Sequence, residues 1–193
     1  MLNLNIEKYD KIQLKDSFFG FFVYAIGDFL AQLILNNFSL TRSIGLGIIG
    51  ASIYAIEIPI WFRFIENVRI KLKNKKNRKN IFLKIDNNLD YKFSPISKML
   101  LATLYFNPLW VARHMFFIKL FSFIENGGSF NILDTFLEII PLANISFTST
   151  IIIVFIGNYI IHNKIALKYR FIGNAIFSSL LAMYYAISIV LFK

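Results

Sequence analysis

The chain has 193 residues, of which 56% are hydrophobic and 17% aromatic, and its mean hydropathy of +0.58 excludes an ordinary soluble domain. Cysteine is absent, which excludes disulfides, a thiolate nucleophile and cysteine metal sites. The net charge of +10 lies in the polar stretches between apolar runs, so it favours anionic lipid headgroups over nucleic acid as a partner. The sequence therefore predicts an all-α, polytopic helical membrane bundle, with residues 1–193 as one membrane domain.

Two apolar runs, residues 17–35 and 44–65, are long enough to be membrane-spanning helices. Asp28 and Gln32 lie one helical turn apart in the first run, on a face that also carries small residues. Glu57 shares a face of the second run with glycines, which allow helices to pack closely. We expect both polar faces to point into the bundle, and residues 36–42 to form the turn between the two spans.

The long polar stretch at 66–97 is predicted to be a basic loop. Six of its basic residues lie close together: Lys71, Lys73, Lys75, Lys76, Arg78 and Lys79. Each basic residue near an anionic membrane surface contributes about 1 kcal/mol, so we expect the loop to bind anionic lipid, cardiolipin included, or a partner subunit. The alternative is a solvated loop that only sets the topology. Nucleic acid is not expected, because aromatic side chains do not alternate with the charges as stacking platforms.

The central span, residues 98–123, carries Arg113 and His114 inside an otherwise apolar run. A charge at the centre of a bilayer costs about 2.5–3.5 kcal/mol on insertion scales, so such residues are usually paired or hydrated. We expect Arg113 to pair with Asp28 or Glu57. Two interpretations of these polar residues stay open: ion pairs that only stabilise the bundle, or the lining of a water-filled path.

Two more spans are predicted at 145–162 and 171–192, after an acidic loop at 125–138; Asn158 lies near the end of the first of them. With five spans, one side of the membrane carries sixteen Lys and Arg residues, and the other carries only Arg42 and Lys193. This asymmetry is typical of the positive-inside rule and favours five crossings, with the N-terminus on the cytosol-like or matrix-like side.

Short motifs along the chain resemble the Mpv-seventeen family, also called the family of the 22 kDa peroxisomal membrane protein. They are Gly27-Asp28 with Gln32, Trp61-Phe62 with Ile65-Glu66, Lys98 to Leu101 with Phe106 and Pro108, and Tyr169-Arg170 with Tyr184. Asn158 stands where the family carries a glutamine, whereas Ala102-Thr103 replaces an Asp-Gln pair. The family is usually described with four spans, one fewer than this sequence predicts.

The resemblance implies a mitochondrial inner-membrane protein, or secondly a peroxisomal one, that forms a small-metabolite pore or maintains the membrane. The alternative is a structural accessory subunit of a large respiratory or ATP-synthase complex. In either case the buried polar network is predicted to contain Asp28, Gln32, Glu57, Arg113, His114 and Asn158. No catalytic constellation, cofactor motif or metal site is recognisable, so enzyme activity is not expected.

Overall fold

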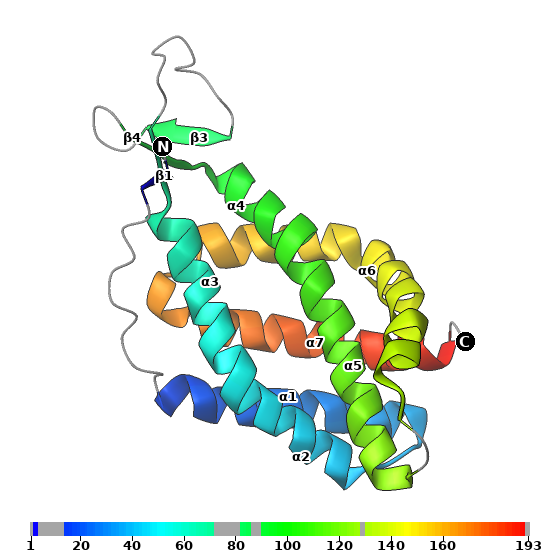
Figure 1. Cartoon of the computed structure of the whole chain (residues 1–193). Coiled ribbons are helices and arrows are strands. Elements are labelled where there is room, and N and C mark those ends of the chain that lie inside the picture. The colour runs from blue at the N-terminus through cyan, green and yellow to red at the C-terminus, as the bar shows by residue number, and fades with distance from the viewer. Residues whose placement is uncertain (1, 4–13, 72–81, 86–89, 128–129, 192–193) are drawn as a thin grey trace.

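The computed structural model describes residues 2–3, 14–71, 82–85, 90–127 and 130–191, and it consists mainly of five long helices (Figure 1). The first is α1 (Leu14–Leu35) and the last is α7 (Arg170–Leu191), which follows the short 3-10 helix η4 (Leu167–Tyr169). The second helix is continuous through α2 (Leu40–Ile49), the π-helical segment η1 (Gly50–Tyr54) and α3 (Ala55–Asn67). The third runs through α4 (Pro95–Leu101), the π-helical segment η3 (Ala102–Phe106) and α5 (Asn107–Asn126), and the fourth is α6 (Ile132–Asn163).

Four helices in the described part of the chain are long and apolar enough to cross a membrane: Leu14–Leu35, Leu40–Asn67, Ile132–Asn163 and Leu167–Ser188. The protein is therefore an all-α integral membrane protein, as predicted. The central helix Pro95–Asn126 is longer than the roughly 30 Å hydrocarbon layer requires, but it is not among these four. Its crossing, and with it the count of five, stays a prediction.

The predicted acidic loop at 125–138 is wrong. Helix α5 continues to Asn126, and α6 begins at Ile132, so residues 127–131 make the connection. Asn131 starts α6 early because its side-chain oxygen accepts a hydrogen bond from the backbone N–H of Leu133 at 3.0 Å. Asp134, which the sequence placed in a loop, lies instead in the first helical turn, where a carboxylate favours the helix dipole.

A small antiparallel sheet lies beside the ends of α3 and α4, and three of its four strands fall within the stretch predicted to be a loop. Its strands are β1 (Leu2–Asn3), β2 (Arg69–Lys71), β3 (Leu83–Ile85) and β4 (Asp90–Phe93), in the order β1-β2-β4-β3. Strand β4 pairs with both β2 and β3, for example at Ile70↔Tyr91 and Leu83↔Phe93. Lys71 ends β2, while Lys73, Lys75, Lys76, Arg78 and Lys79 lie outside the described residues, so the predicted lipid-binding loop stays a prediction.

Contacts between helix ends show that the successive helices alternate in direction. At the sheet end, the side chain of Asn163 donates a hydrogen bond to the carbonyl oxygen of Pro95 at 3.4 Å, and Lys15 lies over the ring of Tyr169. At the opposite end, Ser39 donates a hydrogen bond to Glu125. The start of α1, the sheet and the turn before α7 therefore share one end of the bundle, as Figure 1 shows.

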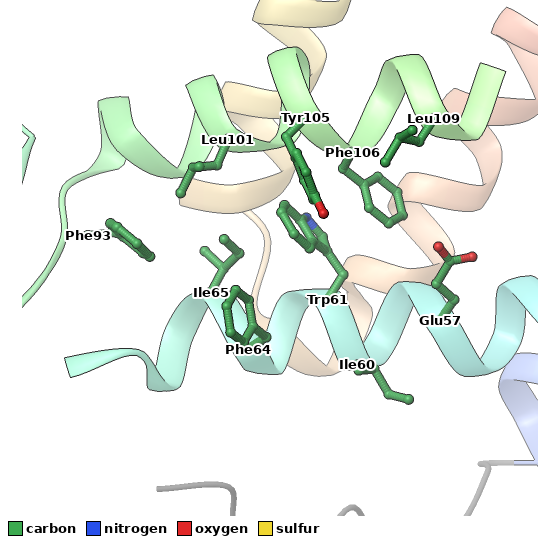
Figure 2. A pocket seen from close by; sticks show the side chains of 10 residues that line it. All are labelled: Glu57, Ile60, Trp61, Phe64, Ile65, Phe93, Leu101, Tyr105, Phe106 and Leu109. Atoms are coloured by element: carbon green, nitrogen blue, oxygen red, sulfur yellow. The ribbon is translucent and has the colours of Figure 1, made fainter. Parts of the chain in front are cut away.

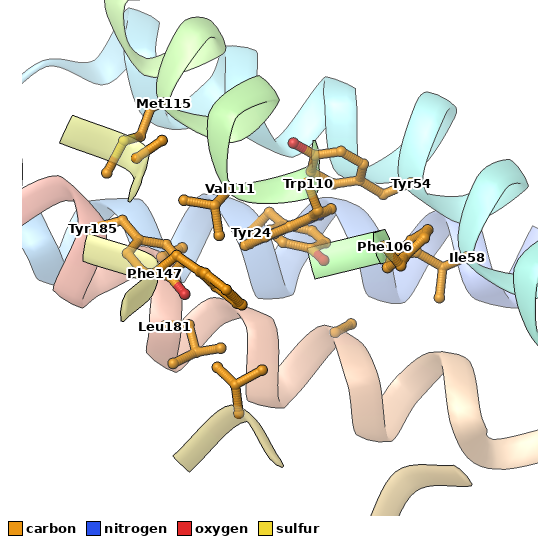
Figure 3. Packing of buried hydrophobic residues seen from close by; sticks show 14 of the residues in the cluster. Tyr24, Tyr54, Ile58, Phe106, Trp110, Val111, Met115, Phe147, Leu181 and Tyr185 are labelled. Carbon is orange, nitrogen blue, oxygen red and sulfur yellow. The ribbon is translucent and has the colours of Figure 1, made fainter. Parts of the chain in front are cut away.

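The core between the helices is closely packed and rich in aromatic residues (Figure 3). The Tyr24 and Tyr54 rings lie 4.9 Å apart, and the Trp110 ring lies 5.7 Å from that of Tyr54. Helices α1 and η1 approach at Gly20 and Gly50, where a methyl group on either residue would collide with the backbone of the other. The π segments both border this core, through Tyr54 in η1 and Phe106 in η3.

Candidate functional site

Asp28 and Gln32, predicted to share a face of the first span, form one buried network with the start of α2. The Asp28 carboxylate accepts hydrogen bonds from the Arg42 Nε at 3.0 Å, the Ser43 hydroxyl at 3.0 Å and the Gln32 Nε2 at 2.5 Å. Asp28 is 3% exposed and Gln32 is fully buried. The Gln32 amide also donates to the carbonyl oxygen of Ser39, so this network fixes the turn between α1 and α2.

Arg42 is the partner that the sequence interpretation missed. It was assigned to the turn, and Arg113 was expected to reach Asp28 or Glu57; the pairing of Arg113 with Asp28 is wrong. Ser39 is the N-cap of α2 and accepts a hydrogen bond from the backbone N–H of Arg42 at 3.1 Å. A serine directly before an apolar run is a recognisable N-cap signal, and Ser39 before Leu40 could have placed Arg42 in the first turn of α2.

Arg113 pairs with Glu57, the other partner that was expected. Its Nη1 donates a hydrogen bond to the Glu57 Oε1 at 2.9 Å, and its Nη2 lies 2.5 Å from Oε2 without hydrogen-bond geometry. The guanidinium carbon lies 5.4 Å from the centre of the Tyr54 ring. Unlike the Asp28 pair, this one is only partly buried: the side chains of Arg113 and Glu57 are 31% and 35% exposed, although Glu57 Oε2 and Arg113 Nε and Nη2 are themselves buried.

His114 is buried next to this pair and joins the aromatic core. Its ring is stacked on that of Trp110 at 4.8 Å, and its Nδ1 lies 3.2 Å from the Tyr54 hydroxyl. His114 therefore shares a hydrogen bond with a tyrosine of the neighbouring helix. Across the described ranges, no group of three or more His, Asp and Glu residues could hold a metal ion.

Asn158 lies in a separate contact, away from the two ion pairs. Its side-chain amide donates a hydrogen bond to the Thr103 hydroxyl at 2.9 Å, and both residues are buried. Thr103 belongs to the π segment η3, which this bond ties to α6. Hydroxyl contacts also join α6 to α7, at Ser146 and Ser188 with 2.6 Å between the oxygens. Such bonds in membranes stabilise helix packing by about 0.6–2 kcal/mol each.

Glu66 forms an ion-pair cluster at the sheet end that the sequence interpretation did not predict. Its carboxylate accepts hydrogen bonds from the Lys98 Nζ at 2.6 Å and the Arg170 Nη1 at 2.5 Å. Arg170 also donates to the carbonyl oxygen of Ile165 at 2.9 Å. Three helices, α3, α4 and α7, are thus joined at one carboxylate. Each of the three charged residues belongs to one of the short motifs that resemble the Mpv-seventeen family. Their place in these motifs is the one sequence signal that could have suggested the ion-pair cluster.

An apolar groove lies between α3 and the central helix, and Glu57, the acidic member of the partly exposed ion pair, is at one end of it (Figure 2). The groove has a volume of about 590 Å³. Its α3 wall includes Trp61 and Phe64, its other wall includes Tyr105 and Leu109, and Phe93 of β4 lies at the sheet end. The Trp61 ring is stacked between those of Tyr105 and Phe106, at 6.0 and 5.0 Å.

Glu57 lies ten residues before the end of its helix at Asn67, and Arg113 lies thirteen residues before Asn126. At about 1.5 Å per residue these separations are roughly 15 and 20 Å, so the ion pair is far from both ends of the bundle. The arrangement places an ion pair without net charge beside an aromatic groove, midway along the bundle. Lys119 of α5 pairs with Glu138 of α6 at 2.5 Å.

Comparison of the chain with known protein families, with curated proteins and with solved structures finds no match in any of the three.

Proposed function

We propose that the protein is a structural subunit of a larger membrane assembly and a divergent relative of the Mpv-seventeen family. The proposed kinship is supported by the way the motif residues meet. Glu66, Lys98 and Arg170, from three separate motifs, form one ion-pair cluster. Asn158 and Thr103, at two positions where the chain departs from the family, hydrogen-bond to each other. Ion pairs and hydrogen bonds of this kind, between residues of different helices, hold the helices together.

The observation that carries the structural role is the half-exposed ion pair of Glu57 and Arg113 beside the aromatic groove. Charged groups facing lipid at this depth are costly, and they usually face protein or water. A transmembrane helix of another subunit, packed into the groove, would cover the pair and bury the exposed side chains of Tyr105 and Leu109. The Asp28 and Arg42 pair, by contrast, is buried inside the chain and needs no covering helix.

The assembly that we propose is in an organellar membrane: the mitochondrial inner membrane first, the peroxisomal membrane second. Its other subunits would be those of a respiratory or ATP-synthase complex, and its lipid partners would include anionic lipids such as cardiolipin. The resemblance to the Mpv-seventeen family supports the organelle. The basic residues at the sheet end support the anionic lipid partner. We propose no catalytic role and no cofactor.

A small-metabolite pore is the second candidate, and the same ion pair favours it. A partly exposed Arg and Glu pair is suited to contact water and polar solutes as well as a protein. The two candidates differ in what covers the pair: another helix in the structural role, and water in the pore.

The test is the mass at which the protein migrates after mild-detergent extraction of its own membranes. We expect migration far above the 22.4 kDa of the chain. The variant Leu109→Trp adds bulk to the groove wall and is expected to migrate at low mass, because the partner helix no longer fits. Its matched control is Ile152→Trp, at an exposed apolar position of α6 that does not line the groove. The control should stay in the assembly.

Migration of the unaltered chain as a monomer or small oligomer would overturn the structural proposal. Flux of small metabolites in liposomes would then be measured for the unaltered chain and for Glu57→Gln. A changed flux with preserved helix content would favour the pore. Equal release of both tryptophan variants would also contradict the proposed role of the groove, because the effect would then come from any added bulk on the lipid-facing surface.

A further inference from the structure

Two lysines from opposite ends of the sequence meet at one tyrosine ring on the basic side of the bundle. The Nζ of Lys15, in the first turn of α1, lies 5.6 Å from the centre of the Tyr169 ring, and the Nζ of Lys168 lies 4.7 Å from it. Tyr169 is 48% exposed, and both lysines are exposed. The site therefore presents two ammonium groups and an exposed aromatic side chain to the outside of the bundle.

These two positive charges have no ion-pair partner within the described ranges. The neighbouring acid, Asp16, is 8% exposed and so is turned away from the surface. Helices α1 and α7 also both begin here, at Leu14 and Arg170, and helix N-termini attract negative charge. The local electrostatics thus favour an anion, and among the described residues no acidic side chain forms an ion pair with either lysine.

The apolar surface that begins at these lysines shows what kind of anion fits. On α1, Phe19, Phe22 and Ile26 follow Lys15 at spacings of four, three and four residues, and all three are exposed. On α7, Ile176 and Leu180 are exposed on the face that continues from Tyr169. The two helices run in the same direction, so both apolar stripes lead from the charged site toward the middle of the bundle.

We propose that Lys15, Lys168 and Tyr169 bind the phosphate headgroup of an anionic phospholipid, whose acyl chains lie along the apolar stripes of α1 and α7. The lysines supply charge and hydrogen-bond donors to the phosphate oxygens, and the tyrosine hydroxyl supplies a further donor. The apolar stripes of α1 and α7 contact acyl chains, so the site favours a phospholipid over a free anion. The site is distinct from the basic loop of residues 71–79, and it holds whether the protein is a structural subunit or a pore.

The test measures binding of short-chain phosphatidylglycerol, with short-chain phosphatidylcholine as the zwitterionic reference, to the full chain in detergent. The double variant Lys15→Gln with Lys168→Gln is expected to lose its preference for phosphatidylglycerol by about 30-fold, because each lysine near an anionic surface contributes a factor of about five. The matched control is Lys164→Gln, which removes an exposed lysine of the same turn. The control should change the preference by less than about twofold.

An equal loss of the phosphatidylglycerol preference in the control Lys164→Gln would overturn the proposed site, because the preference would then depend on the overall charge of this end of the bundle. An unchanged preference in the double variant would overturn it as well. Inorganic phosphate is the third arm of the experiment: if it displaces the lipid at the same concentration, the lysines bind a free anion and the role of the stripes is wrong. The substituted lysines are exposed, so unchanged helix content is expected in every variant.

Discussion

At the scale of single residues, Asp28 shows how a buried charge determines the stability of this bundle. The variant Asp28→Asn is expected to destabilise the protein by about 3–5 kcal/mol, because it leaves the buried Arg42 guanidinium without its counter-charge. The measurement is the loss of far-ultraviolet circular dichroism during denaturant unfolding in detergent. The same assay applied to Arg42→Gln should give a loss of similar size.

The control for this prediction is the double variant, Asp28→Asn with Arg42→Gln. It removes both charges, so it should be clearly more stable than the sum of the two single losses predicts. Additive losses would show that the two side chains act independently, and the ion pair would then not be the reason for the stability of the turn.

The partners of individual charges were only partly predictable from sequence. Arg113 was expected to pair with Glu57 or Asp28, since any intramembrane charge needs a partner, and the pair with Glu57 is present. Asp28 instead pairs with Arg42, which is nearer in the sequence, because the N-cap at Ser39 places Arg42 in the first turn of α2. The contact of Glu66 with Arg170 spans 104 positions in sequence, and nothing in the local pattern gives the distance between two helix ends.

At the scale of elements, the approach of α1 to η1 depends on two facing glycines. The variant Gly20→Ala is expected to cost about 1–3 kcal/mol, because its methyl group meets the carbonyl oxygen of Gly50, which is backbone and has no room to move. The measurement is again denaturant unfolding in detergent. Gly173→Ala is the matched control: its methyl group meets the end of the flexible Ile165 side chain, and alanine also has the higher helix propensity.

We expect the control to be neutral or slightly stabilising. If both alanine variants lose stability equally, the loss does not come from the close approach of the α1 and η1 backbones. It would then be a general effect of replacing a helical glycine in this protein.

The sequence pattern predicted the helices better than their ends and connections. Apolar runs of spanning length are strong signals, and α1 and α7 begin and end within three residues of the expected spans. The start of α6 was misplaced because Asp134 and Glu138 look like loop residues, although one lies in the first turn and the other pairs with Lys119. The strands were missed because each has at most four residues, and because β1 and β2 pair with segments that are distant in the sequence.

At the scale of the whole molecule, the crossing of the central helix decides which side of the membrane each loop occupies. The chain has no cysteine, so single cysteines can be introduced at exposed positions and labelled from one side of sealed membranes. Suitable positions are Asn37 in the first turn, Asn126 at the end of α5 and Lys164 after α6. Five crossings place Asn37→Cys and Asn126→Cys on one side and Lys164→Cys on the other.

Four crossings predict a different pattern: if Pro95–Asn126 did not cross, Lys164→Cys would be labelled together with Asn37→Cys, and Asn126→Cys would be on the opposite side.

We expect the five-crossing pattern for two reasons. The central helix contacts α6 along its length and alternates with its neighbours in direction, so it has the same depth as the helices that cross. The basic segments also share one end of the bundle, and five crossings keep that end on a single side of the membrane. Labelling in the four-crossing pattern would mean that the central helix, which carries Arg113 and one wall of the groove, does not span the membrane, and the proposed covering transmembrane helix would then be wrong.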